Sequence, residues 1–403
     1  MKPLIDAPLL PGGFEFSAAA CGLKKSGLDL GLIVSKTPAA AACVFTTNLV
    51  KAAPILVSEA HLRHSASTMR AIIVNSGNAN CATGPVGLAA SRRTAALVAR
   101  TFSCKPEQIL VCSTGVIGLP LRVERILRAV PSLAASRSTR PESFAQFTRA
   151  IMTTDTRPKF AAASCRIGGK RVRLLGCAKG AGMIHPRMAT MLAFVTTDAT
   201  ASVAVLRRAL GEVVGKTFNA ITVDGDTSTN DTLALLANGA SAAPEIRVGN
   251  TDYRKFLGAL ESVCHSLALQ IVADGEGAHR VVEIEVRGAP SDGAADDVAR
   301  TIANSPLVKT ALAGGDPNWG RLLAAAGRSG VRFNPDRVEV RMAGILMCRN
   351  GRAHLFDERT AHRKLLATRV PIVVNLRAGN GTARMWTCDF TGDYVRINAS
   401  YRS

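Results

Sequence analysis

The sequence is poor in aromatic and in acidic residues. Its 403 residues include 13 Phe, three Tyr and two Trp, and 30 Asp and Glu stand against 50 Lys and Arg, which gives a net charge of +20. A basic surface is the electrostatic footprint of nucleic-acid binding. Proteins that hold single strands also stack the bases on aromatic side chains, however, and those are scarce here. Nucleic-acid binding is therefore an alternative hypothesis and not the leading one.

The excess positive charge lies almost wholly in the first half of the chain. Residues 1–189 hold 25 basic and 8 acidic residues, whereas residues 190–403 hold 25 and 22. The basic residues are scattered, and the densest group, at Lys170, Arg171 and Arg173, falls in a predicted hairpin. We interpret the charge as a bulk property of the surface.

Several motifs that define enzyme classes are missing. The chain has no G-x-x-x-x-G-K-[ST] loop, no H-E-x-x-H helix and no G-x-S-x-G turn. Its ten cysteines form no C-x-x-C pair and have no His at metal-ligand spacing. We expect reduced, mostly buried thiols, no metal and no cofactor.

The first residues, MKPLIDAPLLPGGF, have no continuous apolar core and are interrupted by prolines and a Gly-Gly pair. They do not fit a secretory signal. No apolar run approaches the ~18 residues of a membrane span. These features predict a cytoplasmic protein with no membrane partner.

Apolar periodicity predicts a mixture of helices and strands. Gly168 and Gly169 between alternating runs indicate a hairpin, and residues 131–141 read as a surface loop. The order is irregular, which favours mixed α/β layers over a TIM barrel. Helices are expected at 85–102, 121–130, 203–216 and 253–269, and strands at 69–74, 108–111, 191–199, 218–225, 233–239, 281–288 and 394–398.

Polar loops beside these apolar strands are candidates for a functional site, because a rigid scaffold fixes the groups that a loop exposes. Each loop alone also fits an ordinary turn. The loops are NSGNANCATG, CSTGVIG, TTDT, KGAGMIHPRMATML, VDGDTSTNDT, ADGEGAHR and GGDPNWGRLL.

The segment KGAGMIHPRMATMLAF places Thr190 after a Gly-rich approach and before an apolar strand. A Thr hydroxyl needs a base in order to attack, and a free α-amine with an ordinary pKa of ~7.7–8 is a suitable one. Thr190 gains such an amine only if the bond from Ala189 is cut. An Ala-Thr pair before a strand is common, so the residues alone leave this hypothesis open.

Together these motifs resemble the ornithine acetyltransferase family of arginine biosynthesis, also called the glutamate N-acetyltransferase or ArgJ family. The similarity begins near Gly13 and runs to the last residue. In chain order its segments are GLKKSGLDL, NSGNAN, STGVIG, IMTTDT, KGAGMIHPRMATMLAF, FNAITVDGDTSTND, DGEGA, DPNWGR and WTCDF with DYVRINASYRS.

The resemblance implies an N-terminal-nucleophile-like α/β/β/α sandwich that cuts itself between Ala189 and Thr190. The products would be an alpha chain, 1–189, and a beta chain, 190–403, assembled as a heterotetramer of two of each. Thr190 would take an acetyl group from N2-acetyl-L-ornithine and pass it to L-glutamate in a ping-pong reaction. The hydroxyl of Thr114 and the N–H of Gly115 would stabilise the oxyanion.

The resemblance also implies that Thr153, Lys179, Thr190, Glu276, Asn398 and Ser403 contact the substrates. From their chemistry, Lys179 suits a carboxylate and Glu276 suits the δ-ammonium group of N-acetylornithine, although the opposite pairing stays open. Where the family pattern leads us to expect Ser and Asn, this chain has Ala181 and Arg187.

Three alternatives follow from the same residues. Acetyl-CoA is a second acetyl donor in a bifunctional enzyme but not in a monofunctional one, and no nucleotide motif decides between them. A hydrolase or aminopeptidase of the N-terminal-nucleophile type would use the same Thr190 but pass the acyl group to water. A basic nucleic-acid-binding protein would show no cleavage.

Overall fold

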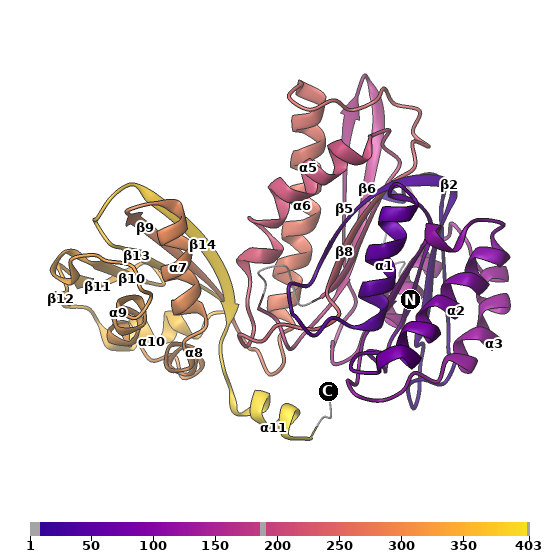
Figure 1. The fold of residues 1–403 in the computed structure, drawn as a ribbon. Coiled ribbons are helices and arrows are strands. Elements are labelled where there is room, and N and C mark those ends of the chain that lie inside the picture. The colour runs from indigo at the N-terminus through magenta and orange to yellow at the C-terminus, as the bar shows by residue number, and fades with distance from the viewer. Residues whose placement is uncertain (1–8, 186–190, 401–403) are drawn as a thin grey trace.

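The computed structural model describes residues 9–185 and 191–400, which form two lobes side by side (Figure 1). The first lobe, up to residue 279, contains an eight-stranded sheet, and the second lobe, residues 280–391, contains a six-stranded sheet. The strands of the first lobe are β1 (Phe14–Ala19), β2 (Leu30–Phe45), β3 (Thr68–Asn75), β4 (Ile109–Ser113), β5 (Lys159–Ile167), β6 (Lys170–Lys179), β7 (Leu192–Thr197) and β8 (Thr232–Ala237).

The first sheet folds back on itself at β2, a 16-residue strand whose register shifts between Val34 and Ala39. The strand order β4-β3-β2-β8-β7-β6-β5 puts four strands between β4 and β6. In a flat sheet these two strands would lie more than ~20 Å apart. Yet Lys179 Nζ, at the end of β6, is 3.1 Å from Thr114 Oγ1, directly after β4. The two halves of the sheet therefore face each other.

Helices cover both outer faces of this folded sheet. α2 (Gly84–Thr101) and α3 (Val123–Ala135) pack on β2, β3 and β4. On the other face, α5 (Val203–Val214) lies beside β2 and α6 (Thr251–Ala273) beside β5 and β6, and both helices share one core with β6, β7 and β8. α1 (Ala53–His64) lies beside β4. The layers give the α/β/β/α sandwich that the sequence predicted.

Phenylalanines fill the space between the two halves of the sheet. The rings of Phe16, on β1, and Phe144, on α4 (Pro141–Ala150), lie 5.1 Å apart, and those of Phe147 and Phe194 lie 5.9 Å apart. All four side chains are buried. This inner core holds the ends of β4 and β6 together, and so fixes the loops that follow them.

The second lobe joins its sheet to helices on one face. Its core lies between the sheet and these helices, and the opposite face carries charged side chains such as Glu285 and Arg384. The strands are β9 (Val281–Ala289), β10 (Glu339–Met342), β11 (Ile345–Arg349), β12 (Arg352–Ala353), β13 (Arg369–Asn375) and β14 (Gly381–Cys388), and the helices are α7 (Asp292–Ala303), α8 (Pro306–Ala313), α9 (Trp319–Gly327) and α10 (Glu358–Leu365).

After β14 the chain returns to the first lobe through α11 (Gly392–Ser400), which is drawn in yellow at the bottom of Figure 1. Asn398 on this helix donates to Glu276 Oε2 of the first lobe at 2.8 Å. The last helix of the chain thus reaches residues that follow α6.

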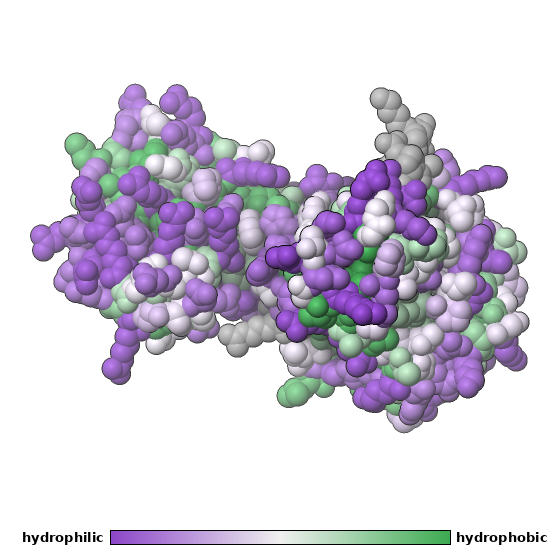
Figure 2. All heavy atoms as spheres, turned by 90° about the horizontal axis from the view of Figure 1, so that it is seen from above, coloured by the Kyte–Doolittle hydropathy of each residue, from purple (hydrophilic) through white to green (hydrophobic). Residues whose placement is uncertain are grey.

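Hydrophilic atoms cover most of the face seen in Figure 2, on both lobes. All ten cysteines are free thiols, and most are buried. Among the described helices, α6 has the length and composition of a membrane span, which the sequence analysis did not anticipate. Half of its apolar window is buried within the fold, where it packs on β5 and β6.

Two predicted strands are wrong. Residues 218–225 form the 3-10 turn Phe218–Ala220 and then a loop with an isolated bridge from Ile221 to Trp386. Residues 394–398 lie in the helix α11. Short apolar runs do not distinguish helix from strand by periodicity, so contacts with the rest of the fold decide.

The predicted surface loop at 131–141 is also wrong in most of its length. α3 continues through Pro131 to Ala135, and α4 begins at Pro141. Proline removes one helical hydrogen bond, but its neighbours Val130 and Leu133 are fully buried. Their packing outweighs that loss.

Candidate active site

A cavity of about 200 Å³ opens where the two halves of the first sheet meet. Loops that follow β4 and β6, the loop before β8 and the helix α11 all contribute to its wall. The polar side chains that line it are Thr114, Thr153, Thr154, Lys179, Asp224, Asp226, Ser228, Thr229, Asn230, Asp231, Glu276, Tyr394 and Asn398.

The structure brings together the described residues that the sequence singled out. The shared position of these residues is a finding, while their roles stay predictions. Ala189, Thr190 and Ser403 lie outside the described residues, as does Arg187. Met191 and Leu192, which follow Thr190 in the chain, line the cavity together with Thr114, Gly115, Thr153, Lys179, Glu276 and Asn398.

Thr114 and Gly115 are fixed by the loop that follows β3. The Thr114 N–H donates to Asn75 O at 2.9 Å. Gly115 has φ +132°, and a Cβ there would lie 2.4 Å from the carbonyl carbon of Gly77. Only glycine permits this approach. The NSGNAN and STGVIG motifs therefore interlock at the cavity wall.

Lys179 extends from the end of β6 toward this wall. Its Nζ donates to Thr114 Oγ1 at 3.1 Å. Burial lowers the pKa of Lys179, and Lys159 adds to this effect, while the negative charges of Asp155, Asp231 and Glu276 oppose it. These neighbouring carboxylates therefore favour the ammonium form of Lys179.

Glu276 enters the cavity from the loop after α6. The Glu276 N–H donates to Ala181 O at 2.8 Å, and its carboxylate accepts from Asn398. A Cβ on Gly182 would lie 2.4 Å from Glu276 Oε2, so glycine leaves room for the carboxylate. The Ala181 side chain is buried beside this contact. Ala181, which departs from the family pattern, thus holds Glu276 through its backbone carbonyl, and its side chain takes no part in that hydrogen bond.

Asp224 was missed by sequence reasoning. Its carboxylate accepts from the N–H groups of Met183 and Ile184 at 2.6 and 2.9 Å, and from the hydroxyl of Tyr394 at 3.4 Å. Burial raises its pKa. Asp224 therefore joins α11 to the segment that leads toward residue 186. The VDGDTSTNDT loop was a candidate as a whole, but nothing in it marked this residue.

Asp231 was also missed. It is 2% exposed, lines the cavity, and its Oδ2 has no hydrogen-bond partner among the described residues. Burial raises its pKa well above the usual value, and the charge of Lys179 opposes that rise. In the parallel pair of β7 and β8, Leu192 lies opposite Thr232, the residue after Asp231.

The cavity wall carries an ammonium group, carboxylates, hydroxyls and exposed loop backbone. Among the described residues, no group of three or more His, Cys, Asp or Glu could hold a metal ion. Opposite charges in the wall of one cavity suit a small zwitterion, because each charged end can find a partner there. The chemistry points to an amino acid or a close derivative.

Comparison with known proteins gives a consistent result. A model of the ArgJ family matches residues 15–403. The arginine biosynthesis bifunctional protein ArgJ of Symbiobacterium thermophilum is 46% identical over 406 residues, which cover 100% of both chains. The protein of the same name from Chlorobium chlorochromatii is 50% identical over 394 residues, which cover 98% of this chain and 91% of that one.

One solved structure also matches over a large part of the chain. The crystal structure of arginine biosynthesis bifunctional protein ArgJ from Bacillus halodurans is similar with a TM-score of 0.51 and 45% identity. It covers 53% of this chain and 100% of the solved chain.

Proposed function

This chain belongs to the ArgJ family and is an acetyltransferase of arginine biosynthesis, and we propose that it works through an acetyl group carried on Thr190. The observation that supports this most directly is the contact between Lys179 and Thr114. It brings the loop that leads to Thr190 against the loop predicted to stabilise an oxyanion, beside a cavity that Met191 lines.

The first proposed step is self-cleavage. The hydroxyl of Thr190 attacks the carbonyl of Ala189, the acyl group moves from nitrogen to oxygen, and water hydrolyses the ester. The products are chains 1–189 and 190–403, and the new α-amine of Thr190 becomes the base for its own hydroxyl. The proposed cleavage site lies between β6 and β7 in the sequence, and these two strands are hydrogen-bonded neighbours in one sheet.

Acetyl transfer then follows in two half-reactions. Thr190 Oγ1 attacks the acetyl carbonyl of N2-acetyl-L-ornithine, and ornithine leaves with a proton on its α-nitrogen. The α-amine of L-glutamate next attacks the acetyl ester, and N-acetylglutamate leaves while the proton returns to the Thr190 oxygen. Each step passes through an oxyanion, which a preorganised donor stabilises by about 3 to 4 kcal/mol.

Thr114 is suited to the oxyanion role. A hydroxyl has one proton to donate and two lone pairs. Lys179 Nζ donates to Thr114 Oγ1, which occupies one lone pair and leaves the hydroxyl proton for the oxyanion. The N–H of Gly115 is the proposed second donor.

Substrate binding uses the charges of the wall. Lys179 pairs with a substrate carboxylate, and Glu276, held by Asn398, pairs with the δ-ammonium group of N-acetylornithine. Thr153 adds a hydroxyl, and Ser403 is proposed to contribute from the chain end. The carboxylate on both substrates explains why a single lysine can serve both half-reactions.

The remaining features of the proposal concern donors and assembly. The enzyme needs no resident cofactor. Acetyl-CoA is a second donor, in keeping with the bifunctional relatives. Two alpha and two beta chains form a heterotetramer in the cytoplasm.

The test begins with the purified chain on a denaturing gel. We expect two fragments, one of which begins at Thr190, and transfer of acetyl from N-acetylornithine to glutamate. Thr190→Ala should stay a single 42.3 kDa chain and show no transfer. A cleaved and active Thr190→Ala variant would overturn the proposal. Release of acetate in place of acetylglutamate would instead identify a hydrolase.

A further inference from the structure

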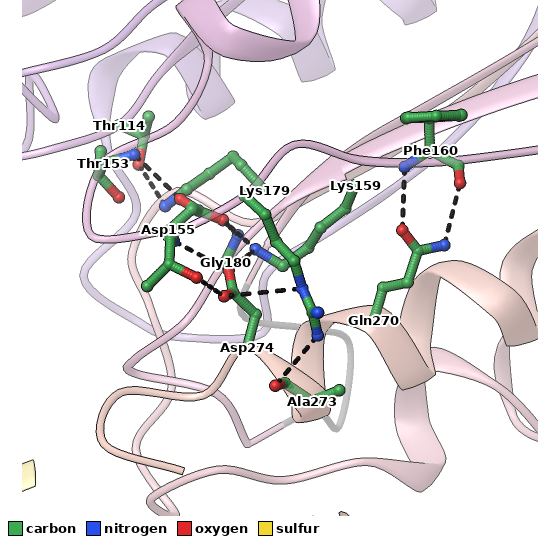
Figure 3. A network of polar contacts seen from close by, with 12 residues as sticks. Thr114, Thr153, Asp155, Lys159, Phe160, Lys179, Gly180, Gln270, Ala273 and Asp274 are labelled. Carbon is green, nitrogen blue, oxygen red and sulfur yellow. Dashed lines mark hydrogen bonds and ion pairs between the residues drawn. The ribbon is translucent and has the colours of Figure 1, made fainter. Parts of the chain in front are cut away.

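We propose that Asp155, paired with Lys159, is a positioning residue that holds the loops of Thr153 and Lys179 together and places a negative charge beside Lys179. This inference rests on the proposed function for the purpose of Lys179, but its geometry comes from described residues alone. The network of contacts is drawn in Figure 3.

Asp155 joins two loops of the cavity wall. Its Oδ1 accepts from the Gly180 N–H at 2.7 Å, and its Oδ2 accepts from the Thr153 N–H at 3.0 Å. Gly180 directly follows Lys179, so one carboxylate fixes the backbone beside two residues that the sequence assigned to substrate binding. Its side chain is 0% exposed.

Lys159 connects this carboxylate to a second one. Its side chain is 0% exposed, and its Nζ lies 2.6 Å from Asp155 Oδ1 and 2.5 Å from Asp274 Oδ2. Asp274 in turn accepts from the N–H and the hydroxyl of Thr156. Glu276 lies two residues beyond Asp274. The buried cation therefore ties together the three loops that carry Thr153, Lys179 and Glu276.

The carboxylate of Asp155 stays ionised although the network is buried. Burial by itself would raise the pKa of Asp155, but Lys179, Lys159 and the Gly180 N–H lower it to about 2. A carboxylate that accepts several hydrogen bonds beside two cations stays ionised. Asp155 therefore carries a negative charge at neutral pH.

Lys179 is surrounded by charges from several elements. Asp155 raises its pKa most among the charged neighbours, Asp231 on the β8 side and Glu276 after α6 raise it less, and Lys159 on β5 lowers it. The negative charge of Asp155 also acts on Lys24, whose pKa is lowered by burial and raised in part by Asp29 and Asp155. Burial and Lys159 lower the pKa of Lys179, and Asp155 opposes them. Without Asp155 we therefore expect the Lys179 ammonium group to lose its proton at lower pH.

The test measures the protonation of Lys179 directly. Competitive labelling of amines with acetic anhydride, followed by mass spectrometry, gives the pH midpoint at which Lys179 becomes reactive. We expect Asp155→Asn to move this midpoint to lower pH by about one unit or more, because a neighbouring opposite charge shifts a pKa by about one to three units and Asp155 raises the pKa of Lys179 more than any other charged neighbour does. An unchanged midpoint in a folded variant would overturn the inference.

A buried carboxylate elsewhere provides the matched control. Asp198 is 1% exposed on its side chain and accepts from the N–H groups of Arg173 and Gly12 at 2.7 and 3.1 Å, at the end of β7 opposite the cavity. Asp198→Asn is expected to lower stability but to leave the Lys179 midpoint in place. A shift of the same size in Asp198→Asn would show that the loss of any buried carboxylate moves the Lys179 midpoint, and it would rule out a specific role for Asp155.

A second variant covers the case in which Asp155→Asn does not fold. Asp155→Asn with Lys159→Met removes a buried anion and a buried cation together, which is less costly than leaving the lysine beside a neutral asparagine. Asp274, the second partner of Lys159, keeps its contacts with Thr156 and Arg157. The midpoint of this double variant should lie below that of the wild type but above that of Asp155→Asn, because Asp155 influences Lys179 more strongly than Lys159 does. A midpoint at or above the wild-type value would contradict the inference.

The catalytic readout separates this inference from the proposed function. If Lys179 binds a carboxylate, kcat/KM for glutamate falls as pH rises through the Lys179 pKa, and Asp155→Asn should move that fall to lower pH. The ionisation of glutamate is the same for every variant. A wild-type protein with no acetyl transfer but with the expected labelling shift would sink the proposed function and keep the positioning role.

Discussion

At the scale of the residue, the cavity depends on the close contacts of three residues, Thr114, Gly115 and Lys179. Thr114 Oγ1 accepts from Lys179, and Gly115 can have no side chain because the backbone of Gly77 lies against it. The negative charge of Asp155 opposes the lowering of the Lys179 pKa by burial. Substitutions that change a single atom at these positions are therefore informative.

Thr114→Val removes the hydroxyl but keeps the shape of the side chain. If that hydroxyl stabilises the oxyanion, kcat should fall by about 10² to 10³, as for loss of one such donor, with little change in KM. Thr114→Ser keeps the hydroxyl and should recover most of the rate. Steady-state kinetics of both half-reactions checks this, and equal activity of the two variants would contradict the role.

Gly182→Ala tests the space around Glu276. The added methyl group would lie 2.4 Å from Glu276 Oε2, so the carboxylate must move, and KM for N-acetylornithine should rise more than kcat falls. Gly258→Ala is the matched control, since a Cβ there meets no atom within 4 Å in the middle of α6. That control should keep its kinetics and gain roughly 0.5–1 kcal/mol of stability.

At the scale of the element, the bend in β2 and the return of α11 decide where the cavity forms. α11 has no buried residue, and it is attached through contacts such as Asn398 with Glu276 and Tyr394 with Asp224. It contributes little to the hydrophobic core. Its contribution is to close one side of the cavity.

Deletion of residues 392–403 should therefore separate stability from activity. We expect the thermal unfolding midpoint to change little, because little apolar surface is exposed, and self-cleavage to continue. KM for N-acetylornithine should rise at least tenfold, because Glu276 loses a partner. Unchanged kinetics in the truncated chain would show that α11 takes no part in binding.

At the scale of the whole molecule, the two lobes divide the chain near residue 280, whereas the proposed cleavage point falls inside the first lobe. β7 is hydrogen-bonded to β6 on one side and to β8 on the other. The two chains would thus share one sheet and one buried core. Neither chain has a complete fold of its own in the first lobe.

The two fragments should consequently remain together after cleavage. We expect them to co-elute on size exclusion, at low salt and at about 1 M salt alike, because hydrophobic burial and sheet hydrogen bonds are weakly screened by ions. Separation should require a denaturant, with both fragments unfolding in one transition. Dissociation by salt alone would mean that the chains are held mainly by charge.

Much of the first lobe was predictable from the sequence. Helices such as 203–216 have a periodic apolar pattern and strands such as 69–74 are β-branched apolar runs, and tertiary contacts reinforce both. The strands expected at 218–225 and 394–398 failed because short apolar runs fit either state. In the structure, Asp224 ties the first segment to other backbone, and the second spans one helical turn from Tyr394 to Asn398.

The sequence by itself determined the family and the set of loops that carry the chemistry, because these follow from ordered motifs. Its local patterns predicted a mixed α/β fold, and the α/β/β/α layers came from the family resemblance. Only the tertiary structure decided which carboxylates support the site. Asp155, Lys159 and Asp274 are ordinary charged residues in the sequence, and their importance comes from the packing of α6 on β5, which buries the Lys159 ammonium group within 2.6 Å of both carboxylates. Local sequence patterns do not predict burial or contacts between distant segments, because both arise only when separate elements pack together.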